Sequence, residues 1–328
     1  MKRHANLSFF VPHLGCPHQC VFCDQRTISG EQKEPSPEEV QSVCDRYLPN
    51  NGDNTEIAFF GGSFTAIDRK IMIGLLEAAY PFVKMGRACG IRISTRPDAI
   101  NEEILHILSE YSVTSIELGA QSMDDDVLLK NGRGHDSKSV INASQLIRDH
   151  GFQLGLQMMV GMYGADDAAK EAYYTASKLA ELMPRTVRIY PTIVVKGTYL
   201  EYLYRTGKYR PLELEEAIEI SADLISFFRH RDIDVIRIGL HYEKSLMDSM
   251  AAGPYHPAFG ELCESRIYRD QMQKMIGNST EAHFLCEPSI LSKVVGQKKS
   301  NINFFNDLGI KITVKPDDFT DGLKIKLP

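Results

Sequence analysis

The segment LSFFVPHLGCPHQCVFC, residues 7–23, places a short strand-like run directly before three closely spaced cysteines. Leu7–Val11 is mostly apolar, and Pro12 ends the run. Cys16, Cys20 and Cys23 then follow at CxxxCxxC spacing. In β/α barrels, the loops at the carboxyl ends of the strands carry the active site. The segment therefore predicts a metal-binding loop at such a rim, if the rest of the chain supplies the barrel.

Six further strand-like runs follow along the chain, and amphipathic helical segments separate them. The runs are rich in Ile, Val, Phe and Leu with little strict alternation, as in strands that are buried on both faces. Repeated βα units of this length predict an α/β fold with a parallel sheet and right-handed crossovers, in a complete or partial β/α barrel. A doubly wound open sheet is the alternative, which spacing alone does not exclude. The runs are Thr55–Phe60, Gly90–Ser94, Thr114–Leu118, Gln153–Val160, Thr186–Ile193 and Asp234–Leu240.

The pattern changes near residue 277. Pro257–Ile276 predicts a long closing helix, and residues 277–280, Gly-Asn-Ser-Thr, predict a linker. Residues 281–328 then alternate strand, helix, glycine-containing turn, helix and strand, with one more strand at the end. The expected organisation is therefore a barrel over 1–276 and a small α+β subdomain over 281–328.

Composition excludes several protein classes. The 328 residues are 43% hydrophobic and 24% charged, which is not typical of a disordered, collagen-like or coiled-coil chain. No apolar run reaches the roughly 18 residues that span a bilayer, and the apolar stretch after Met1 is too short for a secretory signal. We therefore expect a cytoplasmic protein without a membrane partner. The net charge of −6 provides no general attraction for nucleic acid, so any such partner needs a local patch.

The cysteine spacing indicates the chemistry of the rim loop. Three thiolates are too few for a closed structural zinc site, which normally takes four ligands. They suit a [4Fe–4S] cluster with one iron left open, and such an iron can chelate S-adenosylmethionine. Zinc held by the same cysteines with His13 or His18 is the alternative. The odd total of seven cysteines argues against a disulfide framework.

Seven segments, in order over roughly residues 5 to 270, resemble radical S-adenosylmethionine (SAM) enzymes, and among them the Elongator catalytic subunit, a family that modifies the wobble uridine of tRNA. The resemblance implies a partial (β/α)6 TIM-like barrel, a cluster on Cys16, Cys20 and Cys23, and cleavage of SAM to a 5′-deoxyadenosyl radical. It also implies a reductant of the flavodoxin or ferredoxin type and an RNA substrate, tRNA in particular. The matching segments are residues 12–23, 60–65, 95–98, 117–122, 131–135, 157–161 and 188–194.

The same resemblance implies a set of SAM contacts after successive strands. Glycines let a ligand approach the backbone closely, so the Gly-Gly-Ser motif is expected at the methionine amino group. An arginine can pair with the methionine carboxylate in a bidentate manner, and glutamines can bond ribose or carboxylate. The expected SAM-binding residues are Gly61, Gly62, Ser63, Gln121, Arg133 and Gln157.

The sequence also departs from the Elongator pattern. Ser94 stands where that family usually has Glu, so Arg96 is considered for part of that role, with a helix-capping salt bridge as the alternative. No acetyltransferase-like domain follows the barrel, so no acetyl-CoA substrate is expected. Lys196, after the sixth strand, is a candidate substrate contact or else a solvated lysine. No residue can be assigned to catalysis on the substrate.

The glycine-containing turn of the C-terminal subdomain resembles the GxxG turn of KH domains, which clamps single-stranded RNA. Its residues are Gly296-Gln297-Lys298-Lys299, with a lysine in place of the second glycine. Lys298 and Lys299 could reach phosphates. The alternative, equally open, is a subdomain that only caps the barrel.

Two other functions remain as alternatives. An enzyme of the oxygen-independent coproporphyrinogen oxidase type would carry a cysteine two residues after Cys23, where this chain has Gln25. A non-catalytic iron–sulfur protein that binds RNA is the other, and the complete set of three cysteines counts against it.

Overall fold

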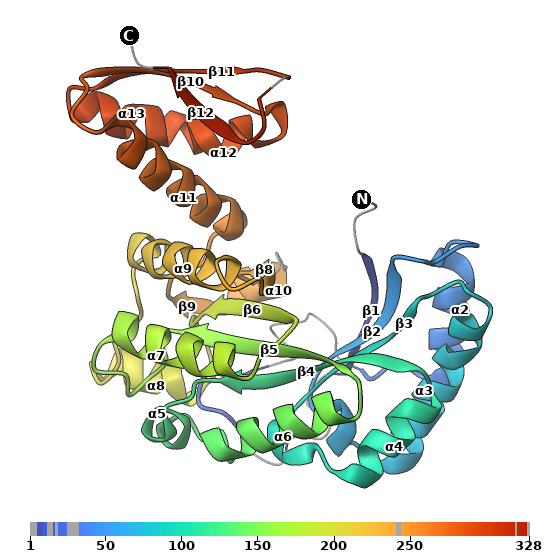
Figure 1. Ribbon diagram of the computed structural model, residues 1–328. Coiled ribbons are helices and arrows are strands. Elements are labelled where there is room, and N and C mark those ends of the chain that lie inside the picture. Colours follow the sequence, from blue (N-terminus) through green and yellow to red (C-terminus); the bar gives the residue numbers. More distant parts are fainter. Residues whose placement is uncertain are drawn as a thin grey trace.

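The computed structural model, which describes residues 5–11, 16, 19–24, 33–240, 244–318 and 320–326, contains a curved sheet of seven parallel strands (Figure 1). Neighbouring strands follow the order β1-β2-β3-β4-β5-β6-β8, so β1 and β8 form its two edges. This curled half-barrel confirms the predicted α/β fold with a partial TIM-like barrel. The strands are β1 (Ala5–Val11), β2 (Thr55–Gly61), β3 (Gly90–Thr95), β4 (Val113–Gln121), β5 (Gln153–Val160), β6 (Thr186–Pro191) and β8 (Asp234–Ile238).

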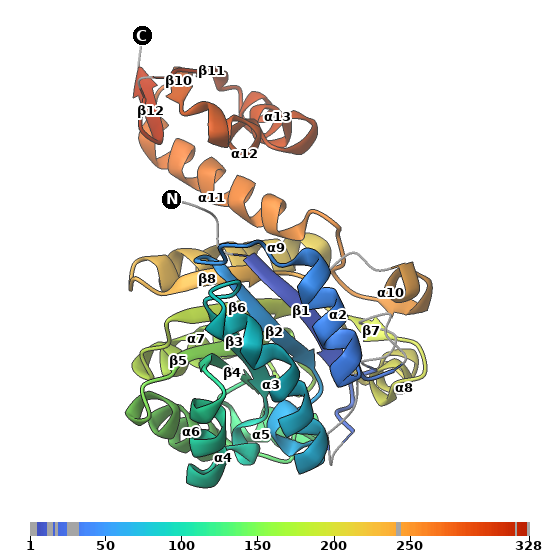
Figure 2. The ribbon, with the colours of Figure 1, turned by 90° about the vertical axis from the view of Figure 1, so that its right-hand side faces the viewer.

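Helices follow the strands and cover the outer face of the sheet (Figures 1 and 2). Side chains cap the first turns of two of them: the Ser36 side chain accepts a hydrogen bond from the Glu39 amide, and Asp136 accepts one from the Ser139 amide. Between β3 and β4, a short 3-10 turn is followed by a helix that Asn101 caps. The helices are α2 (Pro37–Tyr47), α3 (Arg69–Lys84), α4 (Glu102–Glu110), α5 (Asp125–Lys130), α6 (Ser137–Asp149), α7 (Ala168–Glu181) and α9 (Leu214–Arg229).

The two faces of the sheet differ in chemistry. The outer face is apolar, with side chains such as Phe59 and Ile93 in a continuous core under the helices. The inner face carries buried charges, among them Glu56, whose carboxylate lies 2.7 Å from Arg92 of the next strand. Both faces of these strands are therefore largely buried, as expected, but the inner face is polar.

A small insertion after β6 was not predicted. The strand that we expected to reach Ile193 ends at Pro191, and a two-residue strand, β7 (Val194–Val195), then pairs with β9 (Met250–Ala252) in antiparallel fashion. Helices α8 (Tyr199–Arg205) and α10 (Lys244–Ser249) flank this pair. In Figure 2, α8 lies beside β7 at the edge of the molecule.

Helix α11 (Phe259–Ile276) leads away from the barrel to the C-terminal unit (Figure 1). Phe259 and Cys263 belong to the barrel core, whereas Met272 and Ile276 belong to the core of the C-terminal unit. The helix thus takes part in both cores, and the division at residues 276 and 281 stays a prediction.

The C-terminal unit follows the predicted order of elements. Strands β10 and β11 pair in parallel, β12 pairs with β10 in antiparallel fashion, and two short helices lie against the sheet. The elements are β10 (Glu281–Cys286), α12 (Leu291–Val295), α13 (Ser300–Asp307), β11 (Lys311–Pro316) and β12 (Leu323–Lys326). Across the described residues, no helix is both long enough and apolar enough to cross a membrane.

Candidate functional site

The cysteine loop lies at the rim of the barrel, held by backbone hydrogen bonds to two distant segments. The Val21 amide donates to the carbonyl of Asn131 over 3.1 Å. The carbonyl of Val21 accepts from the Leu200 amide over 2.8 Å. Cys20 is buried, and Cys16 and Cys23 are half-buried. The loop is therefore fixed by the end of α5 on one side and the start of α8 on the other.

The surroundings of the loop raise the pKa of two of its thiols. The pKa of Cys23 is raised to about 12, chiefly by burial and next by the Cys20 thiol, while Arg133 acts in the opposite direction. Burial and Cys20 likewise raise the pKa of Cys16, against the effects of Arg96 and Arg133. Since a metal binds the thiolate, metal loading must displace these protons.

The set of donors fits an iron–sulfur cluster with an open iron. The other four cysteines lie elsewhere, Cys44 in α2, Cys263 in α11, Cys286 in β10 and Cys89 just before β3, so none of the described thiols is a fourth ligand. His13 and His18, the alternative zinc ligands, lie outside the described residues. Three cysteines at this spacing suit a cluster that leaves one iron for SAM.

A tighter group of potential metal ligands lies elsewhere in the described part of the chain. The ligand atoms of Glu102, His106 and His150 lie within 4.8 Å of one another, and the three cysteines form no such close group. Glu102 and His150 make an ion pair, 2.8 Å from carboxylate oxygen to Nε2. This cluster joins α4 to the end of α6 and belongs to the outer layer of helices.

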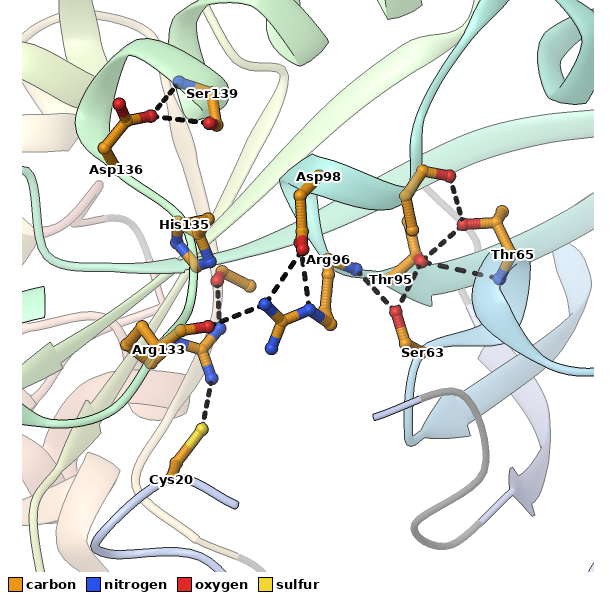
Figure 3. A network of polar contacts seen from close by, with 12 residues as sticks. Cys20, Ser63, Thr65, Thr95, Arg96, Asp98, Arg133, His135, Asp136 and Ser139 are labelled. Atoms are coloured by element: carbon orange, nitrogen blue, oxygen red, sulfur yellow. Dashed lines mark hydrogen bonds and ion pairs between the residues drawn. The ribbon is translucent and has the colours of Figure 1, made fainter. Parts of the chain in front are cut away.

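Arg133 connects the cysteine loop to the sheet (Figure 3). Its Nη1 donates to the Cys20 sulfur over 3.2 Å, and its Nη2 donates to the carbonyl of Gly119 over 2.6 Å. Its own carbonyl accepts from Arg96 over 2.6 Å. The buried Nε has no hydrogen-bond partner among the described residues. A guanidinium so placed can receive a carboxylate bound beside the cysteine loop.

Arg96 is engaged by a carboxylate of its own loop. Its Nε and Nη2 donate to Asp98 over 2.9 and 3.0 Å. Arg96 is buried. Arg96 thus makes a salt bridge at the start of the 3-10 turn Pro97–Ala99, without a side-chain capping bond.

The Gly-Gly-Ser turn after β2 is built from close contacts. Gly61 has φ +105°, and a Cβ there would lie 3.0 Å from the Val11 carbonyl oxygen, so the position needs glycine. The Gly62 amide donates to Val11 over 2.7 Å, which leaves its carbonyl as the group able to accept from an amino group. The Ser63 hydroxyl is shared with Thr95 and accepts from the Arg96 amide (Figure 3).

The two predicted glutamines meet on the inner face. Gln157 Nε2 donates to Gln121 Oε1 over 3.2 Å. Gln121 has φ +69°, a left-handed conformation that costs a non-glycine residue free energy and is typical of functional sites. The next residue, Ser122, donates to the buried carboxylate of Glu171 and holds the turn in place. Glu171 was not singled out from the sequence.

A charged group lies deeper on the same face. Glu117 and Arg188 form an ion pair of 2.6 Å, and the Arg188 guanidinium lies 4.6 Å from the ring centre of Phe60. Ser94, the departure from the family pattern, donates to Glu117 over 3.2 Å. Tyr190 lies within 3.4 Å of Arg188. The sequence alone did not indicate this ion pair.

The structure separates the predicted site residues into three places. In the first place, Arg133 contacts both Cys20 and Gly119, and its carbonyl accepts a hydrogen bond from Arg96. The Arg96 amide donates to Ser63, and Gly119 lies against the Gln121 side chain. These contacts connect the cysteine loop to Ser63 and Gln121. Lys196 lies on the insertion, where its ammonium donates to the carbonyl of Asp248. Lys298 and Lys299 are exposed in the C-terminal turn. Gln25 lies outside the described residues.

Two family profiles match the chain. The radical SAM superfamily matches residues 10–174, and the radical SAM C-terminal domain matches residues 184–269. An uncharacterized protein of Methanocaldococcus jannaschii is 31% identical over 225 residues, 65% of this chain and 68% of that protein. The tRNA uridine(34) acetyltransferase of the same organism is 34% identical over 135 residues, 41% of this chain and 25% of that enzyme. The match thus spans about a quarter of the acetyltransferase.

The fold has a solved counterpart. The archaeal Elp3 of Methanocaldococcus infernus, with residues 1–46 deleted, superposes with a TM-score of 0.64 at 19% identity, over 83% of this chain and 64% of the other. At this level of identity the likeness concerns the fold.

Proposed function

The chain belongs to the radical SAM superfamily and is a radical SAM enzyme related to the Elongator catalytic subunit, and from this premise we propose that it cleaves S-adenosylmethionine on a [4Fe–4S] cluster to modify RNA. Cys16, Cys20 and Cys23 would hold the cluster. The observation that carries the proposal is the contact of Arg133 with both Cys20 and the end of β4, since it sets a cation beside the cysteine loop.

The chemistry supplied by the bound group is the transfer of one electron to SAM, which breaks a carbon–sulfur bond and yields a 5′-deoxyadenosyl radical. A reductant of the flavodoxin or ferredoxin type would deliver the electron. The protein's own residues bind and orient the cofactor. Arg133 would pair with the methionine carboxylate, and the Gly62 carbonyl would accept from the amino group.

The remaining contacts lie further along the inner face. Gln121 and Gln157 offer both donors and acceptors, which suits ribose hydroxyls. The backbone and hydroxyl bonds of Ser63 hold the rim turn that carries Gly62. The half-buried inner side of the barrel, with Phe60 and Tyr190, limits the access of water to this space.

Reconstitution under anaerobic conditions tests the cluster and the cleavage. We expect close to four irons per chain and formation of 5′-deoxyadenosine with dithionite, since a cubane cluster contains four irons. Replacing any one of Cys16, Cys20 or Cys23 by Ala should abolish both, whereas Cys44→Ala, in α2, should retain both. Stoichiometric zinc without cleavage would contradict the proposal.

For the RNA partner we propose that the C-terminal turn contacts phosphates. Lys298 and Lys299 are exposed and adjacent, and both have left-handed backbone, φ +51° and +62°, the region that glycine favours. The turn therefore has an unusual backbone at the position where the KH-like pattern expects its second glycine.

Changing both lysines to Glu tests this contact. RNA binding should weaken uniformly across sequences, and its salt dependence should flatten, because fewer counterions are released. Filter binding of bulk tRNA at two salt concentrations measures both. Cleavage of SAM without substrate should persist. Unchanged affinity and slope would favour the capping role, and profiling of modified nucleosides and porphyrins in a deletion strain separates RNA modification from the coproporphyrinogen oxidase alternative.

A further inference from the structure

Helix α8 and its flanks form a local concentration of tyrosine and positive charge. Residues 196–210 hold four of the 14 tyrosines of the chain. The same 15 residues hold four basic residues against one acidic residue, a net charge of +3 in a chain whose net charge is −6. This is the kind of local patch that an acidic protein needs in order to bind a polyanion.

Two of these tyrosines form an exposed stacked pair. The rings of Tyr199 and Tyr202 lie 5.5 Å apart between centroids, with 24° between their planes. Their side chains are 57% and 51% exposed. Leu200 and Leu203, on the other side of the helix, are buried. The helix therefore packs by its leucines and presents the stacked pair to solvent.

Helix α8 is attached to the cysteine loop itself. The Leu200 amide donates to the carbonyl of Val21, between Cys20 and Cys23, over 2.8 Å. Leu200 and Leu203 belong to the same apolar cluster as Cys20 and Phe22. The exposed rings are thus carried by the helix that supports the cluster-binding loop.

The positive charges around the pair are not all neutralised. Arg205 is paired with Glu201, and Arg210 with Glu216. Lys208 is exposed, and its ammonium lies 5.9 Å from the ring centre of Tyr202. Lys196 is exposed and bonded to a backbone carbonyl, which leaves its charge in place. Lys208 therefore lies beside the stacked rings, and Lys196 stands three residues before Tyr199 in the chain.

Aromatic rings beside lysines form the recognition surface for single-stranded nucleic acid. Unstacked bases lie on the rings, and phosphates lie near the cations. We propose that Tyr199 and Tyr202 stack unpaired bases of an RNA substrate on the outer face of the helix that packs against the cysteine loop, with Lys208 and Lys196 near its phosphates. The proposal rests on the proposed RNA-modifying function and adds a surface that holds the RNA next to the rim.

Binding of a 20-nucleotide oligouridylate to the reconstituted protein tests this surface. A uridine strand has no secondary structure and offers a flat face at every base. We expect Tyr199→Ala with Tyr202→Ala to weaken binding by about tenfold or more, since stacking on an aromatic ring contributes that much per base. Tyr199→Phe with Tyr202→Phe should bind within about twofold of the unaltered protein, because phenylalanine retains the ring.

The salt dependence separates stacking from charge. The alanine variant should keep the slope of affinity against salt, whereas Lys208→Gln should reduce it by about 0.7, the contribution of one phosphate contact on a single strand. Tyr174→Ala, an exposed tyrosine of α7, is the matched control and should bind normally. All variants should cleave SAM without substrate at the same rate.

Two results would overturn the proposal while leaving RNA binding intact: an alanine variant that binds as well as the unaltered protein, or a phenylalanine variant as weak as the alanine one. The second would show that the hydroxyls, and not the rings, make the contact. If the unaltered protein cleaves SAM yet binds neither oligouridylate nor tRNA at low salt, the RNA-modifying function itself fails, and this surface with it.

Discussion

Glu117 and Arg188 form a 2.6 Å ion pair across the inner face of the barrel, although strand β5 lies between their own strands. Gly155 of β5 makes this possible. A Cβ at that position would lie 3.4 Å from the Glu117 side chain and 3.0 Å from the Thr186 hydroxyl. Because Gly155 has no side chain, Glu117 of β4 and Arg188 of β6 can meet across β5.

We expect Glu117→Gln to destabilise the protein by about 3–5 kcal/mol, because it leaves the Arg188 guanidinium buried without its counter-charge. Denaturant unfolding of the cluster-free protein measures the loss. Glu181→Gln, which removes the exposed partner of Lys178, should cost less than about 1 kcal/mol. Equal losses of stability in Glu117→Gln and Glu181→Gln would mean that water screens the Glu117–Arg188 pair as strongly as it screens the surface pair.

We expect His135 to make the free energy of unfolding depend on pH in the acid range. The pKa of His135 is lowered from 6.5 to about 4, chiefly by burial and next by the neighbouring Arg133. Because the unfolded chain takes up this proton at a higher pH than the folded one, stability should fall as the pH drops from about 6.5 to 4, by up to about 3 kcal/mol.

Carboxylates titrate in the same range, so the difference between His135→Gln and the unaltered protein is the informative measurement. The variant should show a smaller loss on acidification from pH 6.5 to 4, with no change in slope between pH 7 and 8. Parallel curves over the whole range would place His135 in a hydrated environment.

We expect a substitution at Gly119 to weaken SAM binding while leaving cluster binding unchanged. A Cβ at this position would lie 3.2 Å from Gln121 Nε2 and 3.4 Å from Arg133 Nη2. Gly119→Ala should therefore displace both proposed cofactor contacts and weaken SAM binding by about tenfold, the effect of roughly 1.4 kcal/mol. Equilibrium dialysis measures affinity, and visible absorbance shows that the cluster remains. Gly74→Ala, within α3, should leave SAM affinity unchanged.

Because the backbone of Lys299 is left-handed, we expect glycine at this position to stabilise the C-terminal unit. A side chain in this region costs about 1 kcal/mol, so Lys299→Gly should stabilise the C-terminal unit by up to about that amount. Lys293→Gly, in helix α12, should instead destabilise it by about 1 kcal/mol. Hydrogen exchange of the β10 and α13 amides reports both changes, and a loss of protection in Lys299→Gly would contradict the expectation.

The features that could be predicted from the sequence are local ones. Strand and helix order follow from periodicity, and the cysteine spacing marks the rim loop before any contact is known. The pair of Glu117 and Arg188 could not be predicted, because it depends on the register of three strands and on Gly155. The tyrosines of α8 are visible in the sequence, but their place beside the cysteine loop follows from the bond between Leu200 and Val21.

The order of the seven strands in the sheet is the order in which a ribosome makes them. Each new strand therefore finds its neighbour already synthesised, and the barrel can grow unit by unit during translation. The cysteine loop differs, because the two backbone hydrogen bonds of Val21 cannot form until Asn131 and then Leu200 have been synthesised. The three thiols of a nascent chain thus stay exposed long before their pocket closes, so we expect the proposed cluster to be inserted late in synthesis or after release.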